Sequence, residues 1–352
     1  MTKNISENRV DYLFVSNSLS GGGAERAINI AVNEMAKKKS PVGLLVINNG
    51  PQDLYAPNVP TFQLNREWQG GFFSVLFAFL KFYFLIIRIR PRVLILNCDL
   101  PELLGAFLFG PWRIVVVEHV PKPWSDRLLL GRIVRKCLSL RKASWVVVSR
   151  HLSPWLSDNS QAAHIPNAIS DKDTSNLMFL PCGDVVKRLV FIGRLTKNQK
   201  QPQWMLDIAE FSRLPVVFFG DGLFRKQLEY DSQAKKINAD FRGFVSNPWD
   251  NLMDGDLLIV PSAWEGDGLV VVEAISRGIP ILLNSIQDLI RFGLPNKNYC
   301  KNPKDFAARI EQNRFNLTDL IADKDFALKL TADRNPKVVA SKWIEFLTHI
   351  SD

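Results

Sequence analysis

The chain has 352 residues, 47% of them hydrophobic, which is enough material for two domains with ordinary cores. Its net charge is +9, and the excess lies in the first half, where residues 1–168 hold 20 lysines and arginines against 11 acids; such a one-sided basic field favours an anionic partner, whether membrane, nucleic acid or phosphorylated substrate. The first residues lack the pattern of a secretion signal, and the four cysteines lie far apart without metal-ligand spacing, so we expect a cytosolic protein with reduced thiols.

Strands and helices are expected to alternate along the first half of the chain. Apolar runs predict strands at 12–16, 42–47, 93–96, 114–117 and 145–149, and helical spacing of apolar residues predicts a helix over 24–38. Continuous apolar runs are typical of strands that are covered on both faces. This half of the chain is therefore predicted to form a parallel, doubly wound α/β sheet.

The same alternation restarts near residue 188. Strands are predicted at 188–192, 216–219, 257–260 and 279–283, with helices over 204–211, 270–277 and 336–350. We therefore expect an N-terminal domain over 1–170, a linker over 171–184, a C-terminal domain over 185–335 and a last helix within 336–352 that packs back towards the N-terminal domain. Because ligands of parallel sheets bind beyond the carboxyl ends of the strands, we expect the site in a cleft between the two domains.

A glycine-rich segment, residues 20–26, follows the first predicted strand and contains Gly22 and Gly23. Glycines let a backbone approach a ligand closely, and the start of the following helix favours negative charge. A plain tight turn is the alternative interpretation. The spacing GxGxxG of dinucleotide-binding loops is absent, which argues against a nicotinamide-dependent enzyme.

Two further segments follow strands of the second half. In residues 193–200, Arg194 and Lys200 place two cations in one loop, as a diphosphate leaving group requires, although a solvated basic loop is the alternative. In residues 261–274, Glu265 and Glu273 are eight positions apart and could hold two ends of one polar ligand. Glu273 lies among valines, alanine and isoleucine, so its carboxylate needs a partner or a ligand.

Taken together, these motifs resemble the GT-B glycosyltransferases, specifically glycosyltransferase family 4 (group 1). The glycine loop, the GR-x5-K loop and the E-x7-E segment come in the order of that family. Three shorter stretches add to the resemblance: 220–228 resembles its GDG-x-x-R-x-x-L turn, 242–245 its GFV strand, and 165–169 its interdomain IPNGI, with Ala168 in place of glycine. The resemblance covers most of the chain and implies two Rossmann-like domains facing across a cleft, a retaining reaction, no metal and no cofactor.

The resemblance also implies roles for individual residues. Arg194 and Lys200 would bind the donor diphosphate and stabilise its departing charge, Glu265 would lie near the transferred sugar, and Glu273 would bind the ribose. His119, which ends a predicted N-terminal strand, would contact the donor sugar. The other donor-binding positions would be Gly22, Gly23, Gly193, Gly243, Phe244, Val245, Gly266, Asp267, Gly268 and Leu269. Asp267 stands where the family usually has an aromatic residue, which leaves the donor sugar open.

The basic N-terminal half contains two segments that suit a membrane surface. Residues 71–87 are apolar but too short and too interrupted to span a bilayer. Residues 122–142 hold seven lysines and arginines, Arg135 among them, against one aspartate, and these are interleaved with leucines, one isoleucine and one valine. We therefore expect a peripheral protein on the inner face of the cell membrane, bound to anionic lipid. A buried helix beside a solvated basic helix is the alternative.

The predicted function is transfer of a sugar from a UDP- or GDP-sugar to a lipid-linked or oligosaccharide acceptor, in lipopolysaccharide, O-antigen or capsule synthesis. A nucleic-acid partner is not expected, because no basic and aromatic recognition motif is visible. Asp171 and Asp173 have the DxD spacing of a metal site but lie in the linker. A nucleotide-sugar epimerase or another non-transferase relative with the GT-B fold remains the alternative.

Overall fold

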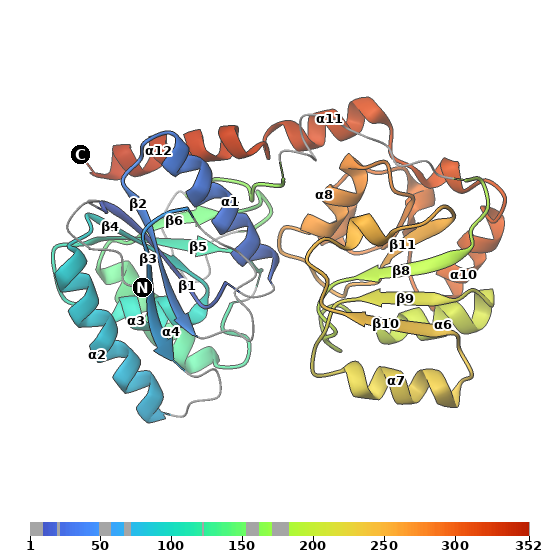
Figure 1. Ribbon diagram of the computed structural model, residues 1–352, viewed down its shortest axis with the longest axis horizontal. Helices are drawn as coiled ribbons and strands as arrows, with labels where there is room; N and C mark the ends of the chain where they lie inside the picture. Colours follow the sequence, from blue (N-terminus) through green and yellow to red (C-terminus); the bar gives the residue numbers. More distant parts are fainter. Residues whose placement is uncertain are drawn as a thin grey trace. The chain divides into compact units, whose positions relative to one another are not determined.

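The computed structural model describes residues 10–19, 22–48, 58–66, 72–121, 123–152, 162–170 and 183–351. It divides into two compact units, which Figure 1 traces in sequence colours. The first unit takes residues 1–170 together with 333–352, and the second takes residues 171–332. None of the described helices combines the length and the apolar character that crossing a membrane requires.

A parallel sheet of seven strands forms the centre of the first unit. Its strands are β1 (Tyr12–Ser16), β2 (Val42–Asn48), β3 (Thr61–Arg66), β4 (Val93–Asn97), β5 (Arg113–Glu118), β6 (Ser144–Val147) and β7 (Ala163–His164). They lie in the order β3-β2-β1-β4-β5-β6-β7. All neighbouring pairs are parallel, as expected for strands joined by crossover helices. The apolar runs therefore form the predicted doubly wound sheet.

Helices cover both faces of this sheet. They are α1 (Gly23–Lys37), α2 (Phe72–Ile89), α3 (Asp99–Ala106), α4 (Leu128–Leu140) and α12 (Pro336–Ser351). Buried residues of α1 and α12 belong to the core on one face, and buried residues of α2, α3 and α4 belong to the core on the other. The last helix of the chain is thus part of the first unit, and it packs along α1.

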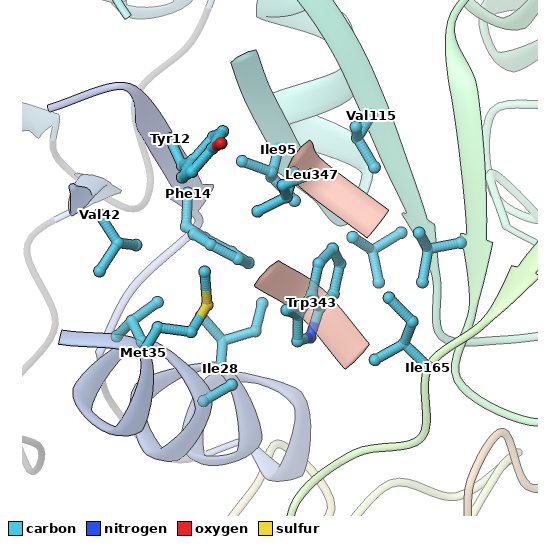
Figure 2. Packing of buried hydrophobic residues seen from close by; sticks show 14 of the residues in the cluster. Tyr12, Phe14, Ile28, Met35, Val42, Ile95, Val115, Ile165, Trp343 and Leu347 are labelled. Atoms are coloured by element: carbon cyan, nitrogen blue, oxygen red, sulfur yellow. The ribbon is translucent and has the colours of Figure 1, made fainter. Parts of the chain in front are cut away.

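Figure 2 shows how α12 enters the first core. Trp343 meets the ring of Phe14 edge to face, with centroids 5.2 Å apart, and Leu347 lies in the same cluster. Ile28 and Met35 of α1 complete the packing around Trp343. Burying side chains of this size contributes roughly 2 kcal/mol each, so α12 is held to the first unit by its apolar face.

The second unit has a parallel sheet of six strands. They are β8 (Arg188–Ile192), β9 (Val216–Phe219), β10 (Ala239–Gly243), β11 (Asp256–Val260), β12 (Ile281–Asn284) and β13 (Tyr299–Cys300), in the order β10-β9-β8-β11-β12-β13. The α-helices of this unit are α6 (Gln203–Ser212), α7 (Arg225–Ala234), α8 (Leu269–Ser276), α9 (Gln287–Ile290), α10 (Pro303–Gln312) and α11 (Lys324–Ala332). Its short 3-10 turns lie at Pro248–Asn251, Asn296–Asn298 and Leu317–Leu320.

Each sheet reverses its direction of strand addition at one point. In the first sheet the reversal lies between β1 and β4, and in the second between β8 and β11. The connections that leave two such strands run to opposite faces of the sheet, so their carboxyl ends open a crevice where ligands of α/β proteins bind. The loops that follow β8 and β11 are those that carry the predicted Arg194, Lys200 and Glu265.

Candidate active site

The loops after β8 and β11 meet in an ion pair. Lys200 Nζ donates to Glu265 Oε1 at 2.6 Å, and Ser262 Oγ donates to the same oxygen at 2.6 Å. The Glu265 side chain is only 4% exposed and that of Lys200 17% exposed. A backbone bond from Ala263 to the carbonyl of Gln199 also joins the two loops. The two predicted residues are therefore in contact, in an arrangement that fixes the Lys200 ammonium.

Helix α9 and the residue after it hold the loop that carries Glu265. The backbone N–H of Glu265 donates to Asp288 Oδ2 at 2.9 Å. Arg291 donates through Nη2 to the carbonyl oxygens of Gly266 and Asp267, both at 2.9 Å. Asp288 and Arg291 were not predicted from the sequence, because their partners lie more than twenty positions away. They set the path of the loop without being part of any motif.

Gly268 allows this loop to turn into α8. Its φ is +67°, a left-handed conformation that residues with a Cβ rarely adopt. A Cβ at this position would also lie 2.9 Å from the ring of Phe292. Leu269 then begins α8, and Asp267 just before the turn is buried. The conformation of the Gly266–Leu269 segment therefore depends on a glycine at position 268.

Glu273 is buried in α8 and bonds to a tryptophan. Trp249 donates its indole N–H to Glu273 Oε2 at 3.0 Å, and Arg277 stacks over the Trp249 ring, 5.0 Å from its centroid. The indole N–H thus supplies one hydrogen bond to a carboxylate whose neighbours in the sequence are apolar. Trp249 therefore orients the carboxylate that we expected to need a partner.

The backbone at the ends of three strands, β8, β9 and β10, comes together at glycines. Gly220, after β9, donates to the carbonyl of Gly243 at 2.7 Å, and a Cβ at Gly220 would lie 1.9 Å from the carbonyl oxygen of Gly193. The predicted strand at 242–245 ends earlier, because β10 stops at Gly243. Phe244 and Val245 therefore follow the strand, and Phe244 is exposed. Arg194 lies exposed on the loop after β8.

In the first unit, His119 lies just beyond β5 and is bonded to Asn97. Its Nε2 is hydrogen-bonded to Asn97 Oδ1, and Asn97 is fully buried at the end of β4. Gly22 caps α1 and Gly23 is its first residue, whereas the start of the predicted glycine segment lies outside the described residues.

A buried ion-pair network includes Glu118, the residue that precedes His119. The guanidinium of Arg135 on α4 binds Glu102 at 2.7 Å and Glu118 at 2.6 Å, and none of the three is more than 1% exposed. Trp124 also donates to Glu102, at 2.9 Å. The prediction that Arg135 belongs to a basic membrane-facing surface is therefore wrong, because two carboxylates from other elements draw it into the core. Arg135 thus also fixes Glu118, which precedes His119 in the chain.

This network makes the stability depend on pH. Burial raises the pKa of Glu102 to about 7, with Arg135 opposing the shift. The pKa of Glu102 in the folded protein is thus higher than its ordinary value of 4.5, so the folded state holds the proton more tightly than the unfolded state. The resulting contribution to the free energy of unfolding is complete below about pH 4.5 and is lost as the pH rises through about 7. In Glu102→Gln, the free energy of unfolding should therefore fall less than in the wild type between about pH 5 and pH 8. Urea titrations measure this, and equal slopes would contradict it.

Metal-ligand side chains do not cluster in the part of the chain that the structure describes. No group of three His, Cys, Asp or Glu side chains there could hold a metal ion. The predicted DxD-like pair, Asp171 and Asp173, lies outside the described residues. Of the four cysteines, Cys98, Cys137 and Cys300 are free, and Cys182 is outside the described residues.

Comparison with known proteins identifies the segment that carries this site. Residues 186–313 match the family model "Glycosyl transferases group 1". This segment is a group 1 glycosyl transferase domain. It contains the Lys200–Glu265 pair, Glu273 and also residues that sequence reasoning missed: Trp249, Asp288 and Arg291.

The likeness to solved structures extends over both units. A sucrose-phosphate synthase from Thermosynechococcus elongatus superposes with a TM-score of 0.75 at 16% identity, covering 97% of this chain and 99% of that one. At this identity the likeness concerns the fold, which is GT-B. The segment that matches the group 1 glycosyl transferase model lies within the second parallel-sheet unit, and His119 belongs to the first.

Two curated relatives match over shorter segments. An uncharacterised 41.2 kDa protein in the cps region of Klebsiella pneumoniae is 30% identical over 106 residues, and an Escherichia coli UDP-Gal:alpha-D-GlcNAc-diphosphoundecaprenol alpha-1,3-galactosyltransferase is 30% identical over 105 residues. The matches cover 29% and 27% of this chain, and 28% and 27% of the relatives. The matched segments thus cover little more than a quarter of the length of each relative.

Proposed function

We propose that this chain is a retaining glycosyltransferase that moves a sugar from a nucleotide diphosphate sugar to a lipid-linked saccharide acceptor. The observation that carries the proposal is the buried Lys200–Glu265 pair at the reversal point of the second sheet, within the group 1 glycosyl transferase domain. This is where α/β sheets bind ligands. The pair also supplies the cation that a diphosphate leaving group needs.

Lys200 can serve the leaving group while it keeps its partner. An ammonium has three donors, and Glu265 Oε1 accepts one of them at 2.6 Å. The remaining donors can turn towards phosphate oxygens as negative charge develops on them. Glu265 and Ser262 would then hold the ammonium in place, and the exposed Arg194 would add a second positive charge from the same loop.

Retention is supported by the bonding of Glu118, the acid that precedes His119 in the sequence. Inversion needs a base that deprotonates the acceptor on the side opposite the leaving group. Glu118 adjoins His119, but it is 1% exposed and bonded to Arg135, so it is not poised to accept a proton. Departure of the diphosphate on the face that the acceptor attacks, with its oxygens assisting, needs no such base.

The acceptor class is proposed from the two relatives. The name of the galactosyltransferase specifies a UDP-sugar donor and a diphosphoundecaprenol-linked sugar acceptor, and the other relative comes from a cps region. We propose by analogy a UDP- or GDP-sugar donor and an acceptor carried on a lipid diphosphate, in synthesis of lipopolysaccharide, O-antigen or capsule. The protein would then work at the inner face of the cell membrane.

A donor screen tests this function. UDP-, GDP-, ADP- and dTDP-sugars are each added to the protein, first for thermal shift and then for nucleotide release with a polyprenol-diphosphate-linked saccharide. We expect stabilisation by one donor class and release of its nucleoside diphosphate that requires acceptor. If the sugar is instead isomerised while still attached to the nucleotide, the epimerase alternative is correct and the transferase proposal fails.

Activity should survive excess EDTA. The side chains of Lys200 and Arg194 would supply the positive charge that a divalent metal supplies elsewhere. Turnover is measured with and without chelator, on protein treated beforehand to remove bound metal. A loss of turnover that Mg²⁺ or Mn²⁺ restores would contradict this design.

The two buried glutamates should differ in their kinetics. Glu273→Gln should mainly weaken donor binding, because a ribose contact is equally strong in the ground and transition states. Glu265→Gln should lower kcat more than donor affinity, because it releases the ammonium that faces the developing charge. Donor titration and steady-state kinetics measure both. Identical losses of kcat in the two variants, with unchanged donor affinity, would contradict the assigned roles.

A further inference from the structure

Helix α2 carries a row of large apolar side chains on its exposed side. Phe73, Leu76, Phe77, Leu80, Phe84 and Ile87, the outer face of α2, are each at least 40% exposed, and Phe77 and Phe84 reach 63% and 68%. Their spacing of three and four residues places them on one side of the helix. Phe82 and Ile86, on the opposite side, are fully buried in the core. The helix is thus apolar towards solvent as well as towards the sheet.

Helix α4 repeats this feature on the same side of the first sheet. Its exposed Leu129, Ile133 and Leu140 are 76%, 55% and 75% accessible, while Val134 and Leu138 are buried in the core that α2 also covers. Monomeric soluble proteins rarely expose several large apolar side chains together, and such patches mark interaction sites. The outer sides of α2 and α4 therefore present an interaction surface on this side of the sheet.

The charges on these two helices all have one sign. Lys81 and Arg88 on α2, and Arg132 and Lys136 on α4, are exposed. Neither helix contains an aspartate or glutamate. The surface thus combines apolar side chains with cations. This combination suits a partner with an apolar interior, which the apolar side chains can enter, and an anionic surface, which the cations can bind.

We propose that the outer faces of α2 and α4 dock on a lipid bilayer with anionic headgroups. At 18 residues α2 is ~27 Å long, and it would lie in the plane of the interface with its phenylalanines among the acyl chains. A second copy of the chain is the less suitable occupant, because a twofold contact would bring the same cations face to face. This docking deepens the proposed function by supplying the membrane partner of a lipid-linked acceptor.

Vesicle sedimentation tests the surface without requiring catalysis. Wild-type protein is mixed with phosphatidylglycerol-containing vesicles and with pure phosphatidylcholine vesicles, at low and at high salt. We expect binding to the anionic vesicles that high salt reduces but does not abolish, because the apolar contribution does not depend on salt. Phe77→Ser with Phe84→Ser should lower the partition coefficient about a hundredfold, roughly tenfold for each phenylalanine withdrawn from the acyl region.

Matched variants of the second unit serve as controls. Phe211→Ser with Phe315→Ser removes two exposed phenylalanines from that unit and should leave binding unchanged. Replacing Lys81, Arg88, Arg132 and Lys136 by glutamine should lower binding to anionic vesicles, whereas the same change at the exposed Lys226, Lys301, Lys304 and Lys324 should have a smaller effect.

Two outcomes would overturn the docking proposal. One is equal vesicle binding by the wild type and by the Phe77→Ser, Phe84→Ser variant with its fold intact. The other is a wild-type dimer in sedimentation velocity that this variant dissociates, without vesicle binding, since the patch would then join two copies. Both readouts are independent of donor turnover, so failure here is distinguishable from failure of the proposed transferase activity.

Discussion

Lys200→Ala is expected to lower turnover by about a hundredfold or more. Removing one preorganised donor to a developing oxyanion costs roughly 3 kcal/mol, and Lys200 is held for that task by Glu265 at 2.6 Å. Arg194→Ala should produce a loss of similar order, because the same leaving group would lose its second cation. Turnover is measured at saturating donor, together with the binding of the corresponding uncharged nucleoside, which should barely change.

Lys197 provides the matched control for these variants. It is an exposed lysine in the same loop, and its ammonium lies 5.8 Å from the centroid of the Phe224 ring. Lys197→Ala should retain turnover within a few-fold of the wild type. Because Lys200→Ala leaves the buried Glu265 without its cation, the stability of each variant is checked by urea titration. Wild-type turnover in folded Lys200→Ala and Arg194→Ala would refute the assignment.

Arg135→Met is expected to destabilise the protein by about 3–5 kcal/mol. Removing one partner of a buried ion pair leaves uncompensated charge in a medium of low polarity. Here Glu118, and Glu102 in its ionised form, would lose the guanidinium that binds both. The free energy of unfolding is measured by urea denaturation, with separate probes for the two units because the chain need not unfold in one step.

Arg132→Met is the control for this substitution. Arg132 lies on the same helix, three positions earlier, but it is exposed. Its replacement should change the free energy of unfolding by no more than about 0.5 kcal/mol, as is usual for surface sites. If both variants were equally stable, the buried network would not hold α4 and β5 together.

The sequence predicted the central strands of both sheets with good accuracy. The expected strands at 12–16, 188–192 and 216–219 coincide with β1, β8 and β9. These strands could be predicted because parallel strands that are buried on both faces appear in the sequence as continuous apolar runs. Strand β3 (Thr61–Arg66) was missed, since it is a mostly polar edge strand with alternating exposure. An edge strand is exposed along one side and leaves a much weaker pattern.

The sequence predicted only those residues of the candidate site that lie in loops directly after strands. Arg194, Lys200 and Glu265 occupy loops after strands, so their approach follows from the order of strands in the sheet. The residues that hold the two glutamates come from a distant helix and a distant turn: Asp288 on α9 holds the backbone of Glu265, and Trp249 holds the side chain of Glu273. Arg135 shows the same limit, because a basic helix with regular spacing does not reveal that one of its cations meets two acids from elsewhere in the fold.

The most direct test of the account is the anomeric configuration of the product. The donor identified by the screen, α-linked to its nucleotide, is incubated with the lipid-linked acceptor, and the anomeric proton of the transferred sugar is followed by NMR. We expect its signal to leave the nucleotide and to reappear on the acceptor with the small coupling of an α linkage. A β-linked product, or a signal that stays on the nucleotide while the sugar itself changes, would contradict the account.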